Sequence, residues 1–152
     1  MSGLRHAGCV ARRMDGAWEG VLLTGPSGAG KSDLTLRLLE EGWTLVADDR
    51  VQLWTSGGRL YARAPDSLAG LLEARGLDVA RRQHRRIARI ALIVECQPPG
   101  TELERIPERS RRSLEGVAVE TFALSALEAS APAKVTLALV RATERRPSDQ
   151  PF

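Results

Sequence analysis

Short apolar runs alternate with turn-forming residues along much of the chain, a pattern typical of β-strands joined by tight connections. The runs His6–Arg12 and Trp18–Thr24 flank the sequence Met14-Asp15-Gly16, which favours a two-stranded hairpin. A second hairpin, around Ser56-Gly57-Gly58, is predicted for the strands Arg50–Trp54 and Arg59–Ala62.

A helical periodicity follows the first predicted hairpin. Leu34, Leu38 and Leu39 lie on one face of the segment Asp33–Glu41, and Gly42 follows as a C-terminal stop. The spacing therefore predicts a helix over this segment, placed directly after a strand.

The remaining segments predict a mixture of strands and helices. Strands are expected at Thr44–Ala47, Arg89–Val94 and Gly116–Phe122, and a helix at Leu68–Glu73. Lys134–Ala142, preceded by Ser130-Ala131-Pro132, fits a helix with proline in its first turn, although its β-branched residues leave a strand possible. We predict one α/β domain over residues 1–145 and a polar, disordered tail at 146–152.

The strongest chemical signal is Gly25-Pro26-Ser27-Gly28-Ala29-Gly30-Lys31-Ser32, which satisfies the pattern G-x-x-x-x-G-K-[ST] between a predicted strand and a predicted helix. Glycines let backbone N–H groups curl around phosphate oxygens, Lys31 reaches the β and γ phosphates, and Ser32 coordinates Mg²⁺. The alternative is a merely structural glycine turn, but the flanking elements favour the chemical interpretation. The segment therefore predicts a P-loop that binds ATP or a similar nucleotide together with Mg²⁺.

Two adjacent acids, Asp48 and Asp49, follow the apolar run Thr44–Ala47. In an α/β sheet this position brings at least one carboxylate close to the phosphates. Such an acid can hold Mg²⁺, or it can accept a proton from an attacking hydroxyl. The alternative is a solvated pair that caps the following turn.

Composition limits the classes of function. The net charge is +3 and 20 of the 22 basic residues are Arg, but they form no basic face of the kind expected for nucleic-acid binding. Cys9 and Cys96 lack the spacing of a metal site or disulfide framework, so we expect two core thiols. No apolar run reaches the length of a membrane helix and no signal peptide is evident, which predicts a cytoplasmic protein.

The stretch GVLLTGPSGAGKSDLTLRLLEEGWTLVADDRVQL resembles the catalytic domain of HPr kinase/phosphorylase, and the likeness continues through His6, Leu71–Leu77 and Glu128–Leu139. The resemblance implies a P-loop nucleotide-binding fold with a mixed β-sheet and flanking helices. It implies a protein-serine kinase that uses ATP and Mg²⁺ to phosphorylate the phosphocarrier protein HPr. In many members of the family the same protein reverses this reaction with inorganic phosphate. The resemblance also implies a homohexamer. The charge and composition described above predict no nucleic-acid or membrane partner.

The resemblance also assigns roles to single residues. Asp49 matches the family's catalytic aspartate, His6 a histidine beside it, and Lys31 and Ser32 its P-loop pair. Glu73 matches a Mg²⁺ ligand, so the expected metal ligands are Ser32, Asp48 and Glu73. Arg105 matches a catalytic arginine that would stabilise the transferring phosphoryl group, and Arg109, Arg111 and Arg112 are close enough in sequence to compete for this role.

The chain also departs from the family pattern. Because it starts just before His6, we expect it to lack the N-terminal domain of longer members. Its basic segment Asp78–Arg86 is shorter than the family's glycine-rich one. The arginines in the segment 81–89 could bind an acidic partner or the nucleotide, but we favour a solvated loop. Ser130–Val135 only partly resembles the stretch associated with dephosphorylation.

Three hypotheses follow. The first is an HPr serine kinase in which Asp49 deprotonates the acceptor serine. The second is a catalytically silent module that senses nucleotide and signals through nucleotide-dependent contacts. The third is a small-molecule kinase on the same scaffold, because a fold alone does not define a substrate.

Overall fold

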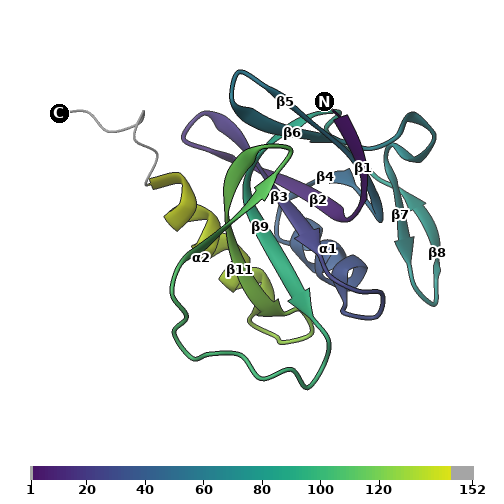
Figure 1. Ribbon diagram of the computed structural model, residues 1–152. Helices are drawn as coiled ribbons and strands as arrows, with labels where there is room; N and C mark the ends of the chain where they lie inside the picture. Colours follow the sequence, from purple (N-terminus) through teal and green to yellow (C-terminus); the bar gives the residue numbers. More distant parts are fainter. Residues whose placement is uncertain (1, 145–152) are drawn as a thin grey trace.

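A computed structural model of the chain describes residues 2–144, so the predicted tail at 146–152 lies outside the described residues. Its centre is a large mixed β-sheet with two helices against one face (Figure 1). The elements in chain order are β1 (Ser2–His6), β2 (Gly8–Met14), β3 (Ala17–Thr24), α1 (Lys31–Glu40), β4 (Thr44–Ala47), β5 (Arg50–Ser56), β6 (Arg59–Arg63), a 3₁₀ turn (Asp66–Leu68), β7 (Leu71–Ala74), β8 (Asp78–Arg81), β9 (Ala88–Gln97), β10 (Ser110–Leu114), β11 (Val117–Ser125) and α2 (Ala131–Glu144).

The sheet is built around three parallel strands. β9 pairs in parallel with β3 on one side and with β11 on the other, and the remaining pairs within the described sheet are antiparallel. The strand order is β1-β5-β6-β9-β3-β2-β4, and β10 joins through β11. This arrangement confirms the predicted α/β fold with a mixed sheet and flanking helices.

Tight turns set the antiparallel pairs. Asp15-Gly16, Gly57-Gly58 and Glu115-Gly116 each have positive φ at both residues, the geometry of the two-residue turns that match the twist of paired strands. The first two turns confirm the two predicted hairpins. The third joins β10 to β11, a pairing that the sequence analysis did not predict.

Both faces of the central strands are buried, so the sheet separates two cores. Val21 and Leu23 of β3 pack with Leu34 and Leu38 of α1 in one core, and Leu22 lies in the other core with Leu53 of β5. This alternation follows from the period of two along a strand. Cys9 and Cys96 are buried free thiols, as predicted.

Several predicted elements are confirmed with small shifts of their ends. Helix α1 begins at Lys31 rather than Asp33, β4 has the predicted bounds, and the C-terminal segment is helix α2 rather than a strand. None of the helices in the described part of the chain is long and apolar enough to span a membrane.

The predicted helix at Leu68–Glu73 is wrong. Residues 66–68 form a 3₁₀ turn, Gly70 has a positive φ of 78°, and β7 begins at Leu71 and pairs with β8. The hydrophobic spacing of this segment suits a helix. Gly70 and Gly76 both have positive φ, however, and they leave room for only a short strand between them.

The arginine-rich segment 81–89 is largely a solvent-accessible connection, the alternative that we favoured, but Arg85 packs against the domain. The Arg85 guanidinium lies 4.3 Å from the Trp18 ring centroid. The backbone N–H of Arg85 donates a hydrogen bond to the Leu45 carbonyl at 2.8 Å. His84 forms an isolated parallel bridge with Leu45, so this segment extends the sheet beside β4. Part of its charge is therefore used for packing.

Candidate active site

The P-loop connects the end of β3 to the start of α1, at the carboxyl end of the parallel strands. Gly25 has a φ of 137°, and a Cβ atom there would lie 2.3 Å from the carbonyl oxygen of Cys96 in β9. Only glycine permits this close approach. Gly30, in a left-handed conformation, precedes α1 and accepts the first helical hydrogen bond from Leu34 N–H at 2.9 Å.

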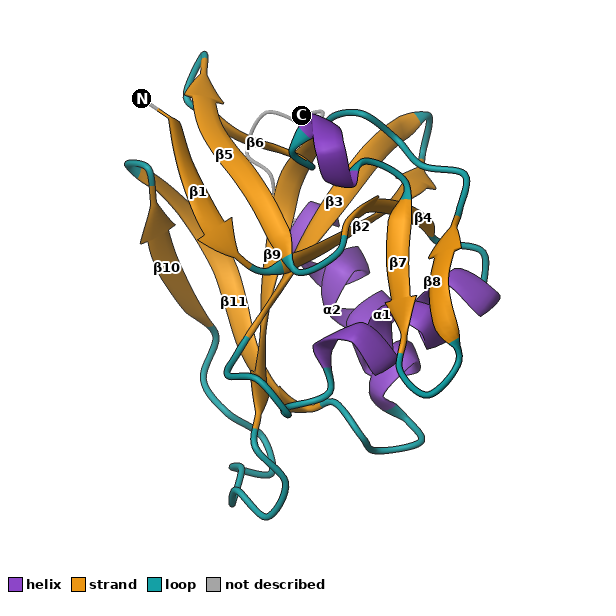
Figure 2. Cartoon of the chain, turned by 90° about the vertical axis from the view of Figure 1, so that its right-hand side faces the viewer, coloured by secondary structure: helices purple, strands orange, loops and turns teal. Residues whose placement is uncertain are grey.

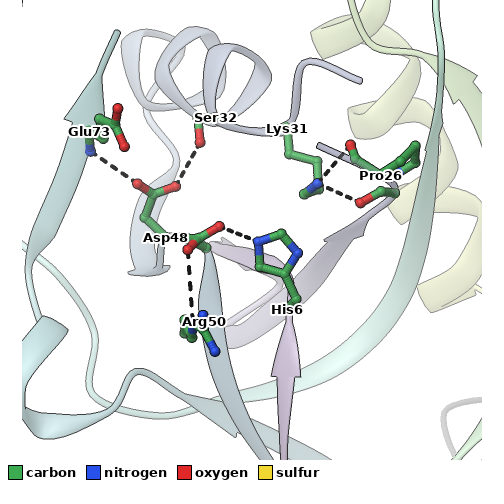
Figure 3. Close-up of polar contacts among 9 residues, drawn as sticks. His6, Pro26, Lys31, Ser32, Asp48, Arg50 and Glu73 are labelled. Carbon is green, nitrogen blue, oxygen red and sulfur yellow. Dashed lines mark hydrogen bonds and ion pairs between the residues drawn. The ribbon is translucent and has the colours of Figure 1, made fainter. Parts of the chain in front are cut away.

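Lys31 lies across the P-loop and is buried, with 9% of the residue exposed. Its ammonium group donates hydrogen bonds to the carbonyl oxygens of Gly25 at 2.5 Å and Pro26 at 3.1 Å. These contacts place a positive charge at the centre of the loop (Figure 3). The arrangement suits a polyphosphate ligand, because a cation lies in a glycine-rich loop at the N-terminus of helix α1.

The Asp48 carboxylate links helix α1 to β7 through two hydrogen bonds. The Ser32 hydroxyl donates a hydrogen bond to its Oδ1 at 3.1 Å, and the Glu73 N–H donates to its Oδ2 at 3.0 Å. Burial raises the pKa of Asp48, and the nearby charges of Asp49 and Glu73 add to this effect, while the two hydrogen bonds oppose it. Figure 3 shows the three residues side by side.

The donor set around Asp48 fits a nucleotide-bound Mg²⁺ better than a dedicated metal cage. Among the described residues, no three His, Cys, Asp or Glu side chains are grouped as metal ligands. Magnesium usually takes one or two protein oxygens and completes its shell with phosphates and water. The Ser32 hydroxyl and the Asp48 carboxylate meet this requirement, whereas Glu73 contacts Asp48 through its backbone.

Asp49 adopts a left-handed backbone conformation, with a φ of 68°. Aspartate tolerates this conformation better than most residues, and such strain is concentrated at functional sites. Its carbonyl accepts a hydrogen bond from Ala7 N–H at 3.0 Å, and its carboxylate accepts one from His6 Nε2. The Arg50 guanidinium lies 4.0 Å from the other carboxylate oxygen.

Strand pairing explains how His6 reaches Asp49. β1 and β5 run antiparallel, and His6 is in register with Arg50, the residue after Asp49. The side chains of His6 and Asp49 are both about half exposed. His6 lies beside the P-loop (Figure 3) and lines a cavity together with Gly25 and Pro26. The structure therefore brings together His6, Lys31, Ser32, Asp48, Asp49 and the backbone of Glu73.

A cavity of about 400 Å³ opens beside these residues. His6, Gly25 and Pro26 line it together with Arg112 of β10 and Glu95 of β9. Arg105 is not among the lining residues, and its exposed side chain makes no hydrogen bond or ion pair with the described residues. The sequence analysis named Arg112 only as a competitor of Arg105 and did not identify Glu95.

The fold and the site define a P-loop nucleotide-binding domain of the α/β class. Residues 13–143 match the family model described as HPr Serine kinase C-terminal domain. Because the match covers most of the chain, the protein belongs to this family.

Curated relatives agree with this assignment. The chain is 39% identical to HPr kinase/phosphorylase from Leptothrix cholodnii over 105 residues, which cover 62% of this chain and 32% of the relative. It is 45% identical to HPr kinase/phosphorylase from Clostridium beijerinckii over 60 residues, which cover 40% of this chain and 20% of the relative. The matches thus span about a third or less of the length of these relatives.

A solved structure shares the fold. The Hpr(Ser) kinase/phosphatase from Coxiella burnetii superposes with a TM-score of 0.75 and 22% sequence identity, covering 93% of this chain and 96% of that one. The similarity extends over nearly all of both chains, which confirms the fold deduced from the strand order.

Proposed function

We propose that this domain is a protein-serine kinase that transfers the γ-phosphoryl group of ATP to a serine of an HPr-like phosphocarrier protein. The observation that carries the proposal is the hydrogen bond between His6 and Asp49 beside the P-loop. A carboxylate that is oriented by an imidazole and lies next to a phosphate-binding loop can accept the proton of a hydroxyl group that attacks the γ-phosphate. Family membership supports HPr as the acceptor.

The chemical step needs a base and a stable position for the phosphates. Asp49 accepts the serine proton as the serine oxygen bonds to the γ-phosphorus, and the bond from that phosphorus to the β-γ bridging oxygen breaks to leave ADP. His6 holds the Asp49 carboxylate in one orientation. Lys31 and the P-loop amides bind the phosphates and limit their motion.

We assign the metal site to Ser32 and Asp48, with Glu73 as a further candidate ligand. When bound there with ATP, Mg²⁺ neutralises charge on the β and γ phosphates. Because burial raises the pKa of Asp48, a cation at this position would favour its ionised form.

The same residues support the reverse reaction, in which inorganic phosphate removes the phosphoryl group from phosphoserine. The relatives are named kinase/phosphorylase, and this naming motivates the extension. The cytoplasmic location that the sequence predicts and the homohexameric assembly that the family resemblance implies both stay predictions.

The direct experiment incubates the protein with γ-labelled ATP, Mg²⁺ and an HPr-like phosphocarrier of the same organism. Label on the phosphocarrier would support the kinase. Nucleotide-dependent binding of the phosphocarrier without labelling would favour the sensing module. Label that reaches only small acceptors in a metabolite extract would favour a small-molecule kinase.

A further inference from the structure

The turn that follows β11 lies against the last glycine of the P-loop. A Cβ atom on Gly30 would lie 2.9 Å from Cδ2 of Leu127 and 3.3 Å from Cβ of Ala126. Ser125, at the end of β11, is in register with Gln97 of β9, and β9 pairs in parallel with β3. The turn therefore lies at the carboxyl edge of the parallel strands, the edge at which α/β sheets bind their ligands.

Leu127 is exposed although it contacts this loop. Its exposed fraction is 54%, whereas Leu124 and Ala126 on either side of the end of β11 are buried. Single apolar side chains are common on protein surfaces, so exposure alone does not define a site. Leu127 differs from the other exposed leucines because its side chain lies beside the backbone of a phosphate-binding loop. It offers a patch of apolar surface next to a strongly polar ligand.

Arg37 of α1 fixes the position of this turn. Its Nη1 donates a hydrogen bond to the Glu128 carbonyl at 3.1 Å, and its Nη2 donates to the Ala126 carbonyl. Its Nε donates to the Asp33 carboxylate at 2.9 Å, one turn earlier in α1. The turn leads into α2, which lies beside α1 on the same face of the sheet (Figure 2). Leu127 is thus held between two anchored carbonyl groups, in a position that is set before any ligand binds.

The candidate metal site lies on the other side of the helix start. Gly30 faces Leu127, whereas Ser32 donates its hydroxyl hydrogen to Asp48. Residues two positions apart project to nearly opposite sides of a helix. The sheet has the same polarity, because β3 lies between β9 and β11 on one side and β2 and β4 on the other (Figure 1). Asp48 and Leu127 therefore flank the P-loop from opposite sides.

This arrangement gives a bound nucleotide one direction. A nucleoside triphosphate has its γ-phosphate at one end and its base at the other, and the α-phosphate lies between them. Catalysis by Asp49, with Mg²⁺ near Ser32 and Asp48, requires the γ-phosphate on the side of β4. The nucleoside then leaves the P-loop on the opposite side, where Leu127 lies.

We infer that the base of the bound nucleotide packs against Leu127, and that Arg37 is the residue that positions this contact. The inference rests on the proposed function, for which it places the nucleoside. The flat faces of a base are apolar enough to pack on aliphatic or aromatic surface, as ligands do in sites lined mainly by apolar side chains. The carbonyl groups of Ala126 and Glu128 already accept hydrogen bonds from Arg37, so the turn contributes apolar contact.

The test separates the base from the phosphates by comparing two ligands. Calorimetry measures binding of ATP with Mg²⁺ and of inorganic tripolyphosphate, which has the phosphates but no nucleoside. We expect Leu127→Ala to weaken ATP binding by about 5-fold to 10-fold and tripolyphosphate binding by less than about twofold. Leu127→Met keeps the apolar contact, so its ATP affinity should stay within about threefold of wild type. Equal losses for the two ligands, or no loss for ATP, would overturn the inference.

Leu137 provides a matched control. It lies in the second turn of α2 and is 70% exposed, so Leu137→Ala removes the same apolar groups from another surface site. We expect this variant to bind ATP as tightly as wild type does. A loss of ATP affinity equal to that of Leu127→Ala would contradict a specific contact at Leu127.

A spectroscopic measurement detects the base directly and is independent of phosphotransfer. The base is the one aromatic part of ATP, so its ring current should move the Leu127 methyl resonances upfield, and tripolyphosphate should not. Loss of these resonances in Leu127→Ala assigns them. If wild type binds ATP but labels no phosphocarrier, the proposed function fails, and the methyl shift still decides the inference. No shift with saturating ATP, or no binding of ATP by wild type, would overturn it.

Discussion

The Nε2 atom of His6 donates a hydrogen bond to the Oδ1 atom of Asp49, although 43 positions separate the two residues in the sequence. The antiparallel pairing of β1 with β5 creates this contact, because it sets His6 opposite Arg50. Both side chains are roughly half exposed, so the bond contributes little to stability. Its main effect is to orient the carboxylate next to the P-loop.

Replacement of His6 tests this positioning role. We expect His6→Ala to lower kcat for phosphotransfer by about 10-fold to 100-fold, because the Asp49 carboxylate loses its fixed orientation. Nucleotide affinity should stay near the wild-type value, and the free energy of unfolding should change by about 0.5 kcal/mol or less. Steady-state kinetics, a nucleotide titration and urea unfolding measure the three quantities.

The second histidine of the chain supplies the control. His84 packs against Gly70, and it forms its bridge with Leu45 rather than with the site. His84→Ala should leave kcat unchanged. A similar loss of kcat in both variants would contradict a specific role for His6.

Two glycines of the P-loop should differ in their tolerance of a side chain. Gly28→Ala meets open space and only the strain of its positive φ, so we expect it to lower the free energy of unfolding by about 1–2 kcal/mol. Gly25→Ala meets the same kind of strain and also places Cβ 2.3 Å from the Cys96 carbonyl, so its loss should be larger. Urea unfolding of the two variants measures the difference, and an equal loss would contradict the close contact of the P-loop with β9.

Asp48 should leave a signature in the pH dependence of stability. Burial raises its pKa in the folded state, so between the ordinary value of 3.8 and the raised value the folded protein holds the proton more tightly than the unfolded chain. The Asp48 contribution is therefore fully present below pH 3.8 and declines as pH rises through this window. We expect the unfolding free energy of wild type minus that of Asp48→Asn to fall as pH rises above about 4. A difference that stays constant or rises with pH would contradict the raised pKa.

The sequence predicted best the elements whose local signals agree with their packing. The turns at Asp15-Gly16 and Gly57-Gly58 carry their own backbone preferences, and the leucines of α1 have one buried face. β10 was missed because its sequence, SRRSL, is polar and almost fully exposed, so it has no hydrophobic alternation. The turn at Glu115-Gly116 was the one signal that could have revealed it.

The site was only partly predictable for a related reason. The P-loop is contiguous, and Asp48 and Asp49 follow a buried strand, so general rules for α/β sheets bring them together. His6 was identified by family resemblance, since its contact depends on the register between β1 and β5. Arg112 lines the cavity because β10 pairs with β11, and the turn at Glu115-Gly116 is the one local signal for that pairing.

The most direct test of the account measures transfer of label from γ-labelled ATP to an HPr-like phosphocarrier by wild type and by Asp49→Asn, with Mg²⁺ present. Asparagine tolerates the left-handed backbone of residue 49 but cannot accept the serine proton. We expect phosphoserine on the phosphocarrier with wild type, a rate at least about 100-fold lower with Asp49→Asn, and unchanged nucleotide binding in both. Equal transfer by the two proteins, or no transfer by wild type despite nucleotide binding, would contradict the account.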